Sequence, residues 1–175
     1  MKETKQVLEK YNIPGMKVLQ QRIPDSEEDL PYLGDSDVVD KKSLLEEASD
    51  DYFEETHPRS WEFSLAAYTG THDSPTTKEW FEEVNKSKYE NFLDYSETLD
   101  NKFDNDVWNF ISLVWESNCQ LAITTVQDLL ELDSKARFNI PGTSENNWIW
   151  RLDNFESLKG VTDSLNALNH STNRN

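Results

Sequence analysis

Three short apolar runs, separated by helical patterns, constrain the fold of this chain more than any other feature. The runs are MKVLQ at 16–20, EFSLAAYT at 62–69 and QLAITT at 120–125. Runs of this length that are bounded by turn residues are typical of buried strands. Because strands that alternate with helices build parallel sheets, the sequence predicts an α/β fold made of βα units.

The segments between these runs predict several helices and one insertion. Apolar spacing and cap residues favour helices over 2–11, from Thr76 or Thr77 onward, over 86–98, over 105–117, after residue 125 and over 153–169. Residues 24–60 are strongly acidic, and only Ser43 begins a capped helical pattern there. We interpret 24–60 as an acidic insertion outside the core, because such runs are usually solvated surface.

The charge of the chain argues against two classes of partner. Its 175 residues include 34 acids against 17 bases, a net charge of −17, and no Lys or Arg cluster that could neutralise phosphates. We therefore expect it to bind neither nucleic acid nor a membrane surface. Since no signal peptide and no apolar stretch long enough to span a membrane is visible, we predict a soluble, cytoplasmic protein.

Few residues have the pattern of a cofactor or metal site. The single cysteine, Cys119, excludes an internal disulfide and a cysteine zinc site, and we interpret it as a buried structural thiol. His57 and His170 have no partner pattern and are interpreted as incidental. No phosphate-binding glycine loop or metal-spaced His pair occurs, so we expect no cofactor and no metal.

Polar residues follow each predicted strand, where parallel α/β folds place their reactive side chains. They are Gln20-Gln21, Thr71-His72-Asp73 and Gln127-Asp128. Such a rim, with Trp148 and Trp150 as apolar surfaces, suits a ligand rich in hydroxyl groups. The alternatives stay open here: Asp73 or Asp128 could cap a helix, and the two Trp residues could be core or groove wall.

Four segments, taken together, resemble one family. IPGMKVLQ at 13–20, YTGTHDSPT at 68–76, VQDLLELDSKARFNIPGT at 126–143 and NWIWRL at 147–152 are similar to the carboxyl-terminal part of the 4-α-glucanotransferases. These enzymes are also called amylomaltases or disproportionating enzymes and form glycoside hydrolase family 77. Four segments in the same order make a chance match improbable.

The resemblance implies a (β/α)8 TIM barrel that transfers segments of α-1,4-glucans or maltooligosaccharides with retention, through a covalent glycosyl-enzyme intermediate. It implies that Asp73, with His72 beside it, grips the sugar and stabilises the transition state. Gln127 and Asn139 lie in matching segments and are candidate sugar contacts. Residues 1–158 would belong to the catalytic barrel, with the insertion at 24–60, and 159–175 would form a terminal helix and a frayed tail.

The family's nucleophile and acid/base lie on strands that would precede this sequence, so the resemblance implies strands six to eight only. We therefore expect a carboxyl-terminal fragment that is inactive alone. A glucan-binding module that completes a barrel with an amino-terminal half is the alternative, since three strands leave two open edges. An unrelated acidic α/β protein ranks last, because it leaves the four matching segments unexplained.

Overall fold

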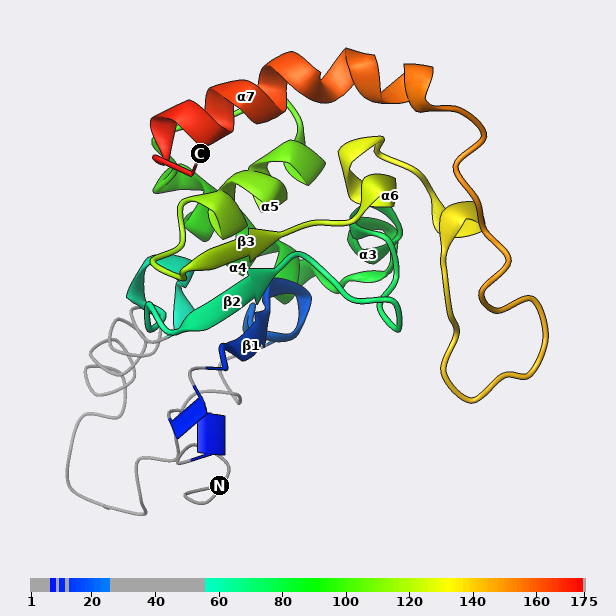
Figure 1. Ribbon diagram of the computed structural model, residues 1–175, viewed down its shortest axis with the longest axis horizontal. Helices are drawn as coiled ribbons and strands as arrows, with labels where there is room; N and C mark the ends of the chain where they lie inside the picture. The colour runs from blue at the N-terminus through cyan, green and yellow to red at the C-terminus, as the bar shows by residue number, and fades with distance from the viewer. Residues whose placement is uncertain (1–6, 9, 12, 26–55, 175) are drawn as a thin grey trace.

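The computed structural model describes residues 7, 8, 10, 11, 13–25 and 56–174, and it confirms a parallel sheet (Figure 1). Strands β1 (Gly15–Val18), β2 (Leu65–Tyr68) and β3 (Leu121–Ile123) are all parallel, with β2 in the centre. Each strand is shorter than its apolar run, because the chain leaves the sheet early. After β1 it turns directly into the 3-10 helix η1 (Leu19–Gln21).

Three α-helices lie between β2 and β3 in the chain, where the sequence predicts them. The helix α3 (Thr77–Glu83) begins with a capping box in which Thr76 and Glu79 bond each other's backbone N–H groups. At α4 (Lys86–Glu97) and α5 (Asp106–Trp115) the cap is a single hydrogen bond, in which the side-chain oxygen of Asn85 or Asn105 accepts a backbone N–H three residues ahead. Side-chain oxygens therefore start all three helices by satisfying backbone donors that would otherwise lack partners.

The remaining helical elements are shorter or less regular. They are η3 (Pro58–Ser60), α6 (Val126–Leu129), η4 (Ser134–Ala136), η5 (Phe155–Val161) and α7 (Thr162–Ser171). The helix predicted over 153–169 is thus a 3-10 segment that continues into an α-helix. The tail predicted to fray is instead anchored as far as Arg174, whose guanidinium donates to the carbonyl oxygens of Trp115 and Ser117.

The core lies between the sheet and α5. In Figure 1, α5 lies against β3, and α7 crosses on the side of α5 away from the sheet. The side chains of Phe110, Ile111 and Val114 in α5 are fully buried, as its broad apolar pattern predicts. Burial of this apolar helix is the main source of stability in this part of the chain.

The two faces of the sheet differ. Leu65, Ala67 and Ala122 point to one face and pack against the helical core. On the opposite face, Met16, Leu121 and Ile123 are exposed, although they are apolar strand residues. The sheet is therefore covered by helices on one face and partly open on the other, whereas parallel sheets are normally covered on both.

The amino-terminal helix and the acidic insertion are only partly described. Residues 7, 8, 10 and 11 are helical, within the helix predicted over 2–11. The insertion at 24–60 lies outside the described residues except at its two ends, and so does the capped pattern at Ser43.

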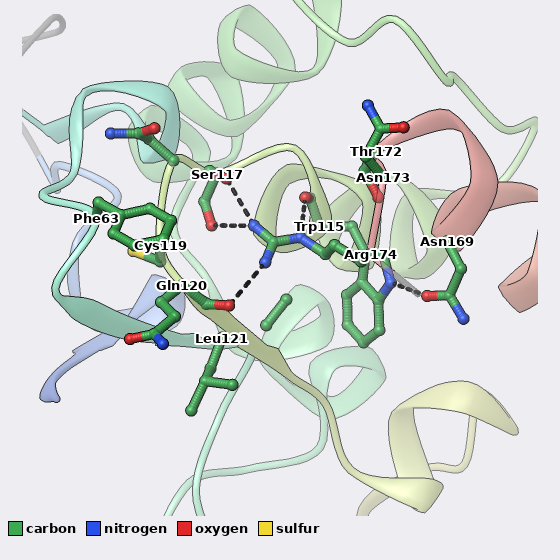
Figure 2. Close-up of a pocket in the computed structure, with 12 residues that line it drawn as sticks. Phe63, Trp115, Ser117, Cys119, Gln120, Leu121, Asn169, Thr172, Asn173 and Arg174 are labelled. Atoms are coloured by element: carbon green, nitrogen blue, oxygen red, sulfur yellow. Dashed lines mark hydrogen bonds between the residues drawn. The ribbon is translucent and has the colours of Figure 1, made fainter.

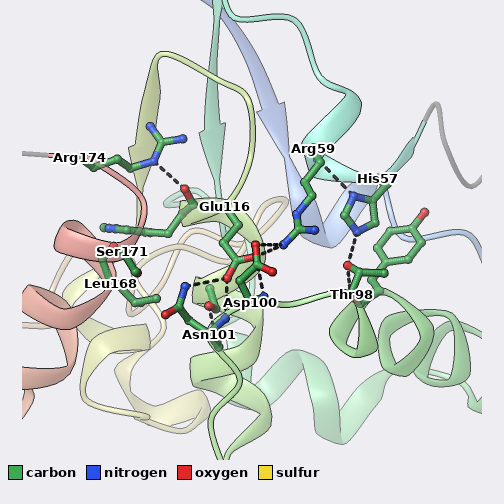
Figure 3. A network of polar contacts seen from close by, with 12 residues as sticks. His57, Arg59, Thr98, Asp100, Asn101, Glu116, Leu168, Ser171 and Arg174 are labelled. Carbon is green, nitrogen blue, oxygen red and sulfur yellow. Dashed lines mark hydrogen bonds and ion pairs between the residues drawn. The ribbon is translucent and has the colours of Figure 1, made fainter.

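At the carboxyl end of the insertion, His57 has a defined structural role, which corrects its interpretation as incidental (Figure 3). Its Nδ1 accepts the N–H of Arg59 at 3.2 Å and so caps η3. The hydroxyl of Thr98 donates to the carbonyl of Tyr95, so Nε2 of His57 donates to the Thr98 oxygen at 2.9 Å. Burial, and then the charge of Arg59, lowers the pKa of His57 to about 4.

Glu116, at the end of α5, is the second centre of this network. Its carboxylate accepts hydrogen bonds from the guanidinium of Arg59 and from the N–H groups of Asp100 and Asn101. Although burial raises the pKa of Glu116, these hydrogen bonds outweigh it and the pKa is lowered. The network joins η3 to the carboxyl ends of α4 and α5 (Figure 3).

Candidate functional site

The loop of residues 70–76, which follows β2, carries His72 and Asp73 at the carboxyl end of the sheet. It is a tight turn in which the N–H of Thr71 donates to Oγ of Ser74 at 3.0 Å. A Cβ at Gly70 would lie 3.1 Å from both Nε2 of Gln20 and Cβ of Ser74, so a larger residue here would press on both side chains. The loop is therefore compact and lies close against Gln20.

One buried carboxylate holds both ends of this loop. Asp128 is 2% exposed; one of its oxygens accepts the Thr69 hydroxyl at 2.7 Å, and the other accepts the N–H of Thr77 at 2.7 Å. Burial raises the pKa of Asp128, and the hydrogen bonds from Thr77 and Thr69 oppose that effect. The carboxylate thus ties the end of β2 to the start of α3. It does not cap α6, which Thr125 does.

A second buried side chain supports the loop from β1. Gln20 donates through Nε2 to the carbonyl of Pro75 at 3.1 Å. The residues that follow β1, β2 and β3 therefore meet around one loop, as the predicted rim requires. Gln21, the neighbour of Gln20, is exposed.

The tip of the loop is exposed, in contrast to its base. The side chains of His72 and Asp73 are 54% and 50% accessible, and Nε2 of His72 lies 3.3 Å from a carboxylate oxygen of Asp73. Nδ2 of Asn139 donates to the other oxygen at 2.6 Å. Three of the four predicted site residues therefore form one cluster. Asp73 does not cap α3, because Thr76 does.

Arg137 completes this cluster and was not singled out from the sequence. Its guanidinium donates to the carbonyl oxygen of Asp73 at 3.4 Å and pairs with Glu79 at 3.2 Å. Its Nε donates to the carbonyl oxygen of Asn139 at 3.2 Å. The one signal for it was its position two residues before Asn139 in a matching segment. Arg137 joins the loop of Asp73, α3 and the segment after η4.

A pocket of about 190 Å³ opens beside this cluster. His72, Thr76, Asp128 and Phe138 line it, and so does Gln127, the fourth predicted site residue. Gln127 is buried and donates to the carbonyl oxygen of Ala136 at 3.3 Å. The side-chain amide of Gln127 therefore lines the pocket, and one of its N–H groups is already bound to the backbone.

Aromatic rings flank the pocket. The centroid of the Trp148 ring lies 5.0 Å from that of His72. It lies 4.8 Å from that of Phe138, whose ring meets the indole edge to face. Trp148 is exposed and Trp150 is half-buried, so neither is part of the core. The segment that carries them loops away from the body between η4 and η5, on the side of α3 and α6 (Figure 1).

A second cavity, of about 550 Å³, lies by the amino end of β3 (Figure 2). Arg174 points into its wall, where main-chain oxygens of Trp115, Ser117 and Gln120 accept its N–H groups. Cys119 is buried there, as predicted, and burial raises the pKa of its thiol. Because the arginine is engaged by the backbone, this cavity offers little for a charged ligand.

Two further findings concern ions and membranes. Over the described ranges of the chain, no three His, Cys, Asp or Glu residues gather as a metal site would require. Within the same ranges, no helix is long and apolar enough to cross a lipid bilayer.

The described residues form an α/β fold in which a carboxylate, an imidazole and an amide lie beside the ring of Trp148. Such a set can bind hydroxyl groups and stack on apolar sugar faces. Comparison with known proteins gives the family. The 4-alpha-glucanotransferase model of glycoside hydrolase family 77 matches residues 1–157. The chain belongs to this family, as the resemblance predicts.

Individual relatives support the same assignment. The chain is 34% identical over 150 residues to a 4-alpha-glucanotransferase of Clostridium butyricum and 32% identical to one of Synechocystis sp.. Each match covers 85% of this chain but only 25% and 24% of the relative. The chain thus spans about a quarter of the length of these curated relatives.

A solved structure shares the fold. An amylomaltase from Streptococcus agalactiae in complex with acarbose matches 99% of this chain and 30% of its own length, with a TM-score of 0.73 at 23% identity. The small parallel sheet and its helices therefore have the architecture of part of an amylomaltase.

Proposed function

We propose that residues 1–158 form the carboxyl-terminal part of a 4-α-glucanotransferase catalytic barrel. In this proposal β1, β2 and β3 are strands six, seven and eight of a (β/α)8 barrel. The parallel order and the partly open face with Met16, Leu121 and Ile123 support it, because the inner face of a barrel packs against strands that come from elsewhere. The chain covers about a quarter of the length of its relatives, which agrees with a partial barrel.

The proposed substrate is an α-1,4-glucan, and Asp73 is proposed to bind its hydroxyl groups and favour the oxocarbenium-like transition state. The observation that carries this role is the exposed cluster of Asp73, His72 and Asn139 on a loop whose base is rigidly held. His72, Asn139 and Gln127 are the proposed sugar contacts. A fixed carboxylate surrounded by donors is suited to charge stabilisation.

Transfer with retention also needs a nucleophilic carboxylate and an acid/base. In the described part of the chain, two carboxylates that support this loop are already engaged: Glu79 pairs with Arg137, and Asp128 holds Thr69 and Thr77. We propose that the 175-residue chain is inactive alone and depends on carboxylates from an amino-terminal part. A cytoplasmic location stays a prediction.

Activity can be tested in two settings. The pure chain is incubated with maltotriose, and appreciable formation of longer or shorter oligomers would contradict inactivity. A chimera in which residues 1–157 replace the matched part of a bacterial relative should transfer glucan. Asp73→Asn in this chimera should lower kcat roughly 10³-fold or more while the protein stays folded. Unchanged activity would remove Asp73 from the mechanism.

A second candidate function is that of a module that binds glucan or completes a split barrel. Among the described residues, β1 and β3 lie at the edges of the sheet, and this favours the alternative, because an edge strand exposes backbone groups that can pair with another chain. Sedimentation of the chain with and without a co-expressed amino-terminal half tests it. A folded, monodisperse monomer that ignores this half would contradict the need for a partner.

A further inference from the structure

Trp148 has a backbone conformation that bulky residues avoid. Its φ is +64°, in the left-handed region. The other non-glycine residues with positive φ in the described ranges have ordinary reasons: Glu131 directly follows the end of α6, and Asn146 and Asn173 are of the type that tolerates this region. Trp148 has neither reason, so the strain calls for another explanation.

The surroundings hold Trp148 in this conformation from both sides. Its N–H donates to the carbonyl oxygen of Phe138 at 2.8 Å, and its own carbonyl accepts from Nη1 of Arg151 at 2.8 Å. The Phe138 ring then meets the indole edge to face, at an interplanar angle of 88°. Backbone and ring are both fixed, so the indole is presented in one orientation.

Burial does not account for the placement of this ring. Trp148 remains 51% exposed, whereas Trp61, Trp80, Trp108 and Trp115 are buried. The exposed indole lies 5.0 Å from the ring of His72, and His72 is 3.3 Å from the carboxylate of Asp73. A strained, fixed and open aromatic surface therefore stands next to the proposed hydroxyl-binding cluster.

We propose that Trp148 is a platform on which a glucose ring of the α-1,4-glucan stacks beside the sugar held by Asp73. A pyranose has an apolar face of C–H groups that packs on an aromatic ring, and hydroxyl groups at its edge that bind polar side chains. Trp148 supplies the first surface, and His72 and Asp73 supply partners for the second. This inference rests on the proposed function and adds one binding residue to it.

The test is an NMR titration of the full chain, labelled with ¹⁵N, with maltopentaose. The indole N–H signal of Trp148, assigned by its loss in Trp148→Phe, should shift saturably together with backbone amides of residues 70–76. Trp148→Gly should weaken binding about three- to tenfold, because the ring is removed, and Trp148→Phe should stay within about twofold of wild type. Trp150→Phe is the matched control and should bind as wild type does.

Stability separates a binding role from a merely structural one. Glycine adopts φ of +64° without strain, so Trp148→Gly should unfold at the same urea concentration as wild type or a higher one. Lost binding with retained stability supports the platform. A loss of stability that accompanies the loss of binding would overturn it, since the ring would then act through the fold.

The remaining outcomes distinguish this proposal from the function on which it rests. If the amides of 70–76 shift and the Trp148 indole does not, the platform is wrong and glucan binding by the loop stands. If the indole shifts and Asp73→Asn binds as tightly as wild type, the role of Asp73 fails and the platform stands. If no signal shifts at the solubility limit of the sugar, both are overturned for this chain.

Discussion

The base and the tip of the loop at residues 70–76 each contain an aspartate, and the two are used in opposite ways. Asp128 at the base is buried, with each oxygen bound to one end of the loop. Asp73 at the tip is half exposed and bonded to Asn139 and His72. The buried carboxylate builds the loop, and the exposed carboxylate remains accessible to a ligand. Exposure, more than residue type, therefore distinguishes the aspartate that holds the loop from the aspartate that a ligand can reach.

The largest effect on stability is expected at the base. Asp128→Ala leaves the Thr77 N–H buried without an acceptor and leaves the Thr69 hydroxyl with only the Thr124 hydroxyl as a partner, so the free energy of unfolding should fall by roughly 2–4 kcal/mol. Urea unfolding followed by circular dichroism measures it. Asp128→Asn is the conservative control and should lose less, since one carbonyl oxygen can still accept. If Asp128→Ala lowered the free energy of unfolding less than Asp73→Asn does, the contrast between the base and the tip of the loop would be wrong.

An intermediate effect is expected at His57, which is a second buried polar group far from the loop. Because its folded pKa of about 4 lies below the unfolded value of 6.5, the unfolded chain binds the proton more readily between these values. The contribution of neutral His57 is complete above pH 6.5. It is lost as the pH falls toward 4, by about 1–2 kcal/mol after solvent screening.

His57→Asn is the matched control for this pH dependence. Asparagine can accept the N–H of Arg59 as a helix cap, but it does not titrate. The free energy of unfolding of this variant should therefore depend less on pH between 6.5 and 4 than that of wild type. Identical profiles for the two proteins would show that other groups control acid stability.

The smallest effect on stability is expected at the tip. Asp73→Asn and Asn139→Ala change exposed side chains, and each should alter the free energy of unfolding by no more than about 0.5 kcal/mol. Glucan binding should nevertheless weaken in both, more strongly for Asp73→Asn. Calorimetric titration with maltopentaose, beside urea unfolding of the same samples, checks the pair. If either variant lost stability but bound maltopentaose as wild type does, its side chain would support the fold and would not bind the ligand.

Much of the local structure followed from the sequence. Thr76 was one of two recognisable cap candidates, with Thr77, because a capping residue acts on N–H groups only two or three positions ahead. The apolar stripe of α5 and the three strand runs were likewise visible, since helical and strand periodicity are short-range properties. The segments around Asp73 and Asn139 also indicated the family and its candidate site residues, because such motifs are continuous in the chain.

Which polar groups support the scaffold depends on contacts between segments that are far apart in the sequence. The contacts of Asp128 with Thr69 and Thr77 join residues 59 and 51 positions apart, and Asn139 reaches Asp73 across 66 positions. No local pattern encodes such pairings, because they depend on how the strands stack side by side. For the same reason the roles of Arg137 and His57, and the strained exposure of Trp148, emerged only when distant segments met.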